Sequence, residues 1–126
     1  MKAILFVLSA LTAITLTTGE INKDCRACLF ITAVIKKAMV HGQEIVSDKI
    51  TAITCPKLMQ SDPRHMEKVC KRVIADTVGS SALLKKIKRG KKLGNWMSYF
   101  CSRELPKKYC PDGYHNPRLF RELSKI

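Results

Sequence analysis

Along most of the chain after residue 24, apolar residues recur at three- and four-residue spacing, which is the period of an amphipathic helix. A first apolar face spans residues 27–39, and this helix is expected to end at Gly42. A second face spans residues 45–53, and Pro56 is expected to break the helix that carries it. Strand signals are weak by comparison, so the pattern predicts an all-α fold.

Three more helices are expected in the second half of the chain. The third is expected to begin at Asp62, whose side chain can accept a hydrogen bond from a first-turn amide, followed by Pro63 at the first helical position. Gly79 is expected to end it. A fourth helix is expected over residues 80–90, capped by one of the two serines at its start, and a short fifth over residues 95–105. The prediction is therefore four to five short helices.

The first 19 residues have the layout of a secretory signal peptide. Lys2 precedes an apolar run, and the small residues Thr17 and Gly19 occupy the −3 and −1 positions of a cut before Glu20. The run is shorter than the ~20 apolar residues that span a bilayer, although a short membrane anchor is the alternative. We expect a protein that is secreted, or held in a granule- or lysosome-like compartment, with a mature domain of about 107 residues.

Six cysteines follow this leader, and their even number in a short exported chain indicates disulfide bonds. The C-x-x-C motif of Cys25 and Cys28 also fits a redox centre or half of a zinc site, but the sequence lacks a second such motif, a histidine cluster and a βαβ context. If Cys55 and Cys70 flank a helical hairpin, they are the natural local pair, and the opening cysteines then join the closing ones. Six cysteines allow fifteen pairings, so spacing alone leaves the pairing open.

This order of cysteines and helices resembles the saposin-like family, over roughly residues 21–110. The resemblance implies five helices folded as two leaves, and it implies the disulfides Cys25–Cys110, Cys28–Cys101 and Cys55–Cys70. The family includes lipid-binding activator proteins, membrane-permeabilising defence proteins and lipid-modifying enzymes, so the fold alone does not settle function.

Two features depart from the family pattern. The last two cysteines usually stand six apart, whereas Cys101 and Cys110 stand nine apart with Pro106 between them, so the helix is expected to end near Leu105. The second is the tail, residues 111–126, which follows a saposin-like domain expected over residues 20–110. The tail is interpreted as a packed or frayed terminus; the alternative is a short helix that starts at Asn116 and Pro117 and carries Leu119, Phe120 and Leu123 on one side.

Charge narrows the choice of partner. The chain carries a net charge of +13, about +12 without the leader, which favours anionic partners such as phospholipid head groups, bacterial envelopes, heparin-like glycans or nucleic acid. The densest basic segment lies in residues 83–96, where an apolar side and an aromatic residue accompany the cations. A helix of this kind suits the head-group layer of an anionic membrane, although a solvated helix face is the alternative. The predicted membrane-binding residues are Lys85, Lys86, Lys88, Arg89, Lys91, Lys92 and Trp96.

Catalytic and metal-binding motifs are absent from the sequence, which has no G-x-S-x-G elbow, no H-E-x-x-H and no Gly-rich phosphate loop. We therefore expect neither enzymatic activity nor a cofactor or metal. The predicted function is binding of anionic membranes or lipids, followed by permeabilisation as an antimicrobial or cytolytic effector, with self-association on the membrane as a further expectation. The alternatives are a lipid carrier that leaves membranes intact and a basic ligand for glycans or a receptor; no specific nucleic acid is expected.

Overall fold

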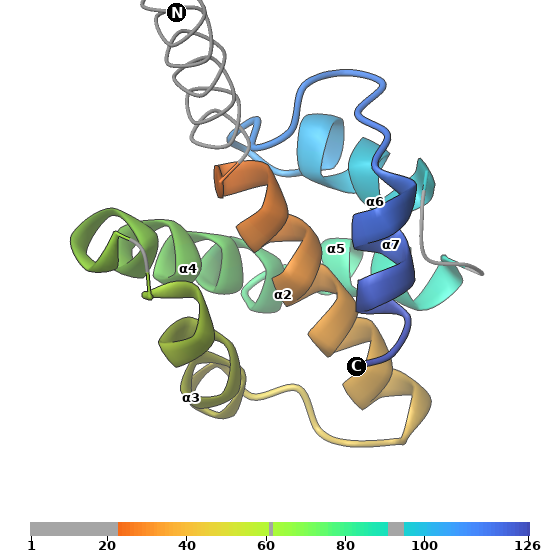
Figure 1. The fold of residues 1–126 in the computed structure, drawn as a ribbon. Coiled ribbons are helices and arrows are strands. Elements are labelled where there is room, and N and C mark those ends of the chain that lie inside the picture. Colours follow the sequence, from red (N-terminus) through yellow and green to blue (C-terminus); the bar gives the residue numbers. More distant parts are fainter. Residues whose placement is uncertain (1–22, 61, 91–94) are drawn as a thin grey trace, which may run out of the picture.

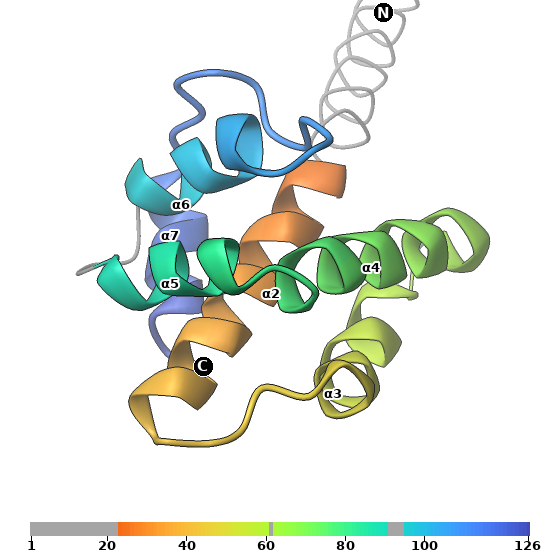
Figure 2. The ribbon, with the colours of Figure 1, turned by 180° about the vertical axis from the view of Figure 1, so that it is seen from behind.

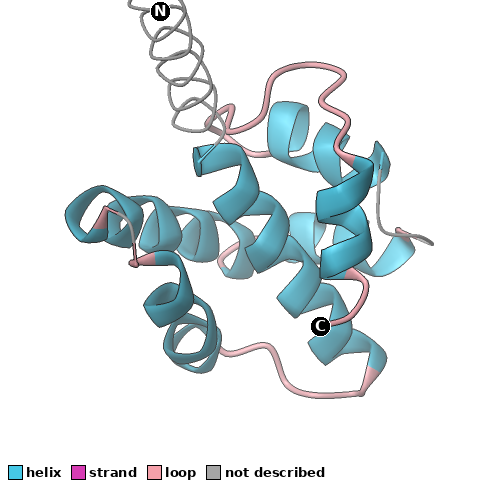
Figure 3. Ribbon diagram, viewed as in Figure 1, coloured by secondary structure: helices cyan, strands magenta, loops and turns pink. Residues whose placement is uncertain are grey.

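The computed structural model describes residues 23–60, 62–90 and 95–126, and throughout these residues it contains helices and connecting loops but no strand (Figure 3). The all-α prediction is confirmed. The predicted signal peptide, residues 1–19, the first three residues of the predicted domain, and Lys91 and Lys92 lie outside the described residues. The elements in chain order are α2 (Lys23–Val40), α3 (Ser47–Leu58), α4 (Pro63–Val78), α5 (Ser81–Arg89), α6 (Asn95–Tyr99), the π-helical turn η1 (Phe100–Glu104) and α7 (Pro117–Leu123).

Helix α2 lies at the centre of the molecule, and the other helices pack around it (Figure 1). The hairpin of α3 and α4 lies to one side of α2, whereas α6 and α7 lie to the other, as the view from behind also shows (Figure 2). Ten residues of α2 are buried, which is a far wider face than the single apolar stripe of a surface helix. Such a helix is stable only where other helices surround it.

The helix boundaries correct the sequence prediction in two places. Helix α3 does not break at Pro56 but continues to Leu58, where Met59 N–H donates to the carbonyl of Cys55. A proline this close to a helix end removes one backbone hydrogen bond and leaves little helix beyond it to distort. The helix also begins later than the apolar pattern from residue 45 predicts, since Val46 is extended and α3 begins at Ser47.

Of the two helix caps that the sequence predicts, the one at Ser80 forms and the one at Asp62 does not, and a further cap forms at Asn116. Ser80 accepts a hydrogen bond from Leu83 N–H at 3.2 Å and begins α5, and Asn116 accepts one from Leu119 N–H at 3.1 Å and begins α7. Asp62 occupies the N-cap position of α4, but its side chain makes no capping hydrogen bond. The prediction for that side chain was wrong, and the helix start is defined by backbone geometry and by the proline that follows.

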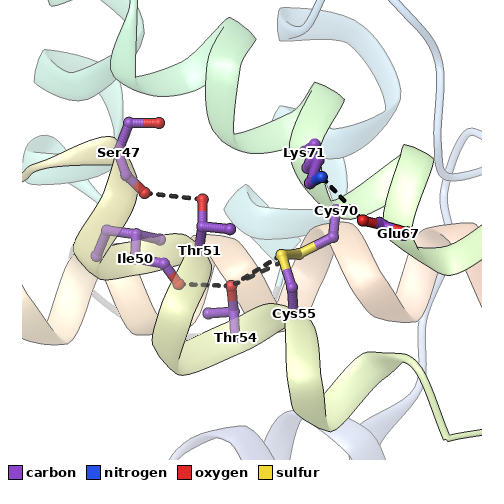
Figure 4. The surroundings of a disulfide bond; sticks show 8 residues. All are labelled: Ser47, Ile50, Thr51, Thr54, Cys55, Glu67, Cys70 and Lys71. Carbon is purple, nitrogen blue, oxygen red and sulfur yellow. Dashed lines mark hydrogen bonds and ion pairs between the residues drawn. A yellow bond between two sulfur atoms is a disulfide. The ribbon is translucent and has the colours of Figure 1, made fainter. Parts of the chain in front are cut away.

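Three disulfides join Cys25 to Cys110, Cys28 to Cys101 and Cys55 to Cys70, the same pairs that the family resemblance implies. The first connects α2 to the segment after η1 and the second connects α2 to η1 itself, so both ends of the domain are tied together. The third closes the α3–α4 hairpin. Next to it, the buried Thr54 hydroxyl lies 3.6 Å from the Cys70 sulfur and donates to the Ile50 carbonyl at 2.7 Å (Figure 4).

The chain turns sharply after η1, as the spacing of the last two cysteines predicts. Leu105 is extended, with φ −79° and ψ 154°, so the helix ends at Glu104. The N–H groups of Tyr109 and Cys110 then both donate to the Cys101 carbonyl, at 2.9 and 3.2 Å. This return brings Cys110 back to α2 without requiring nine helical residues between the two cysteines.

The tail packs onto the domain. Helix α7 lies beside α2 (Figure 1), and its three apolar residues, Leu119, Phe120 and Leu123, are buried in the same core as α2. The short helix that the sequence offered as the alternative is therefore present, and it completes the core on one flank of α2.

Candidate anion- and lipid-binding surfaces

Helix α5 presents its cations to solvent and its apolar residues to the core. Leu83 and Ile87 are buried, whereas the side chains of Lys85, Lys86, Lys88 and Arg89 are exposed. The 3.6-residue period separates these two sets onto opposite faces of one helix. Because the apolar face is already used in packing, the surface that α5 offers to a partner is a charged one.

The predicted cations of α5 fall into two groups. Lys86 forms an ion pair with Glu104, which neutralises part of its charge. Lys85, Lys88 and Arg89 form no ion pair with a carboxylate of the described residues. Helix α5 is also held to α2, since the Lys36 ammonium donates to the Lys88 carbonyl at 2.7 Å. The cationic face is thus fixed to the central helix.

Trp96 lies at the edge of this cationic face and is half-buried. Its indole packs against Gly90, and the two residues line one hollow of about 300 Å³ together with Lys86 and Arg89. A Cβ atom at Gly90 would stand only 2.4 Å from the ring, so glycine is required for this approach. The structure therefore brings Trp96 together with two of the predicted cations, while Lys85 and Lys88 lie outside this hollow.

A second surface, which the sequence analysis did not single out, is an apolar groove between α2 and α3. It has a volume of about 670 Å³, within the range of small-molecule sites. Ile53 lines this groove and is 51% exposed, so the groove presents a large apolar side chain to solvent. The other apolar residues that line it are Phe30, Val34, Ala38, Ile50 and Ile126, and its charged residues are Lys37, Lys49, Lys57 and Glu44.

A third surface is a basic hollow of about 430 Å³ formed by the first half of α4 and the segment before Cys110. It is lined by His65, Lys68, Val69, Lys71, Arg72, Lys107 and Tyr109. Tyr109 is almost wholly buried, and burial is the main reason why the pKa of its hydroxyl is raised above 10.0. Part of this hollow could have been found from the sequence, because Lys68, Lys71 and Arg72 share one face of a helix. The contribution of Lys107 could not, because this residue is distant from the other three in the sequence.

No helix in the described part of the chain is both long and apolar enough to cross a bilayer. No protein-family model, curated protein or solved structure matches the chain.

Proposed function

We propose that this protein is a secreted, cationic, saposin-like protein that binds anionic membranes and permeabilises them. The observation that carries the proposal is the face of α5, where three exposed cations, Lys85, Lys88 and Arg89, have no carboxylate partner among the described residues. Each such residue near an anionic membrane contributes ~1 kcal/mol, and salt weakens the attraction. The half-buried Trp96, which lines one hollow with Arg89, suits the head-group layer.

Binding and permeabilisation draw on different parts of the molecule. Exposed cations bring the protein to the surface, but the apolar faces of its helices are buried in the core. Permeabilisation consequently requires the helices to separate, so that core residues reach acyl chains. The Cys55–Cys70 disulfide keeps α3 and α4 together, whereas the other two bridges tie α2 to the end of the domain. This arrangement favours movement of the α3–α4 hairpin as one unit.

The test is dye release from anionic and zwitterionic vesicles at low and physiological salt, with oxidised protein and with reduced, alkylated protein. We expect release from anionic vesicles only, weaker in salt and dependent on the disulfides. A variant with Lys85, Lys88 and Arg89 changed to glutamine should bind anionic vesicles about 10- to 100-fold more weakly. The charge-matched control changes Arg118, Arg121 and Lys125, which are exposed on and after α7. Equal losses in both variants, or no binding to anionic vesicles at low salt, would contradict the proposal.

The groove between α2 and α3 favours a second candidate function, transport of single lipid molecules without membrane damage. Its exposed Ile53 and its lysines suit an acyl chain with an anionic head. Lipid that co-purifies at a fixed stoichiometry, together with an absence of dye release, would favour transport over permeabilisation. Strong heparin binding with no affinity for either kind of vesicle in physiological salt would instead indicate a glycan or receptor ligand.

A further inference from the structure

The basic hollow beside α4 has an unusual charge balance. Two of its basic side chains have acidic partners: Lys71 pairs with Glu67 at 2.8 Å, and His65 lies 2.7 Å from Asp24. The remaining three cations, Lys68, Arg72 and Lys107, form no ion pair with a carboxylate of the described residues. Like charges four residues apart on a helix, as at positions 68 and 72, repel each other. An anion in the hollow would remove this repulsion.

The cation opposite α4 is held in place by the disulfide frame. Lys107 lies over the Tyr109 ring, with its ammonium 5.7 Å from the ring centroid, a distance typical of a cation–π contact. Tyr109 is 5% exposed, and its N–H donates to the Cys101 carbonyl at 2.9 Å. Cys110, the next residue, is bonded to Cys25 at the start of α2. The backbone that carries Lys107 is thus fixed against the core, and the hollow does not depend on a free loop.

We propose that this hollow binds a phosphomonoester group. A phosphomonoester carries a charge of about −1.5 to −2 at neutral pH, which matches three unpaired cations better than the single charge of a phosphodiester. The guanidinium of Arg72 can bind two of its oxygens at once, while Lys68 and Lys107 supply point charges on either side. A free phosphate ester and a lipid with a terminal phosphate present the same chemistry to these side chains.

The basic hollow is a separate part of the molecule from the surfaces on which the proposed function rests. None of the residues that line the hollow belongs to α5, and none lines the groove between α2 and α3. Loss of the α5 cations therefore leaves the hollow intact, and loss of the hollow leaves the α5 face intact. The two proposals can fail separately.

The test is a titration of the full, oxidised mature chain with glycerol 3-phosphate at low salt, followed by amide and side-chain NMR shifts. We expect saturable binding that moves the signals of Arg72 and of the segment around Lys107. The double variant R72Q/K107Q should raise the Kd by at least about tenfold, which corresponds to the loss of charge-assisted hydrogen bonds. The charge-matched control R118Q/R121Q should stay within about twofold of wild type. All the changed side chains are exposed, and the single variant K68Q, with a smaller loss, provides a second measurement if the double variant unfolds.

Two further arms identify the source and the specificity of the ligand. Vesicles that contain phosphatidic acid are compared with phosphatidylglycerol vesicles of equal surface charge. A preference for phosphatidic acid that R72Q/K107Q abolishes assigns the site to a lipid head group, whereas binding of glycerol 3-phosphate without that preference assigns it to a free ester. Both results support the site. Equal affinity for a phosphodiester such as glycerophosphoglycerol, unsaturable shifts, or wild-type affinity in R72Q/K107Q would overturn it.

Discussion

Replacement of Gly90 by alanine should move the indole of Trp96. In the structure, a Cβ atom at position 90 would lie 2.4 to 2.7 Å from three ring atoms of Trp96. Carbon atoms in contact normally stand ~3.5–4.0 Å apart, so the ring has to shift by about 1 Å. Overpacking of this kind costs ~1–3 kcal/mol. Gly90 has φ −60° and ψ 118°, which alanine adopts without strain, so the change also restricts the unfolded chain and returns ~0.4–1 kcal/mol.

The expected net loss is therefore about 1–2 kcal/mol of unfolding free energy, and each kcal/mol lowers Tm by ~4–8 °C in a domain of this size. Trp96 is the only tryptophan in the chain, so its fluorescence reports the movement directly. We expect G90A to shift the emission to longer wavelength, because a displaced indole gains contact with water. Urea unfolding followed by circular dichroism gives the free energy independently of the fluorescence.

Two controls separate the steric effect from a general effect of losing glycine. Gly42 and Gly113 have φ values of +68° and +70°, with no atom within 4 Å of an added Cβ. Their alanine variants should lose ~1–2 kcal/mol through backbone strain, with no change in tryptophan emission. In a W96L background, which removes the ring, G90A should cost much less than in wild type, a coupling of ~0.5–3 kcal/mol. Wild-type stability and unchanged emission in G90A would refute the reasoning.

Two other predictions follow from the disulfides and from Tyr109. The double variant C55A/C70A should lose ~3 kcal/mol, because its bridge spans 15 residues. Joint loss of the Cys25–Cys110 and Cys28–Cys101 bridges, which span 85 and 73 residues, should cost more, whereas loss of Cys25–Cys110 alone should not, because Cys28–Cys101 still closes most of that loop. Urea unfolding measures each variant, and a smaller loss from the joint variant than from C55A/C70A would contradict the chain-entropy argument. Since burial raises the pKa of Tyr109 above 10.0, its contribution to stability is complete below pH 10.0 and falls as the pH rises through the folded pKa. Y109F should therefore lose less stability than wild type in alkaline urea titrations, and an equal loss in both proteins would contradict this cause.

Much of the fold is determined locally by the sequence. The helices follow from the three- and four-residue spacing of apolar residues, and the starts of α5 and α7 follow from Ser80 and Asn116, whose side chains act on amides only three residues away. The sharp end of η1 also follows from local spacing, because helical residues between Cys101 and Cys110 would place the two sulfurs on opposite faces. These features could be predicted because each depends on interactions between residues that are close in the sequence.

Other features depend on contacts between distant residues, and only the tertiary structure decided them. Helix α3 runs past Pro56, against local propensity, next to the disulfide that joins it to α4. The tail became part of the core because α2 offers an apolar flank to Leu119 and Phe120.

The charged surfaces divide in the same way. The basic run on α5 is visible in the sequence because its cations are neighbours along one helix. The basic hollow is visible only in part, since Lys107, which lines it together with Arg72, lies far from α4 in the sequence, in the segment that the Cys25–Cys110 bridge ties to α2. Apolar period and cysteine number thus determined an all-helical, cross-linked domain. Which cations lie close together depended on the tertiary structure, in which the two bridges to α2 hold the segment of Lys107 beside α4. The physical reason is that the interaction between two charges depends on their distance in space and not on their separation in the sequence.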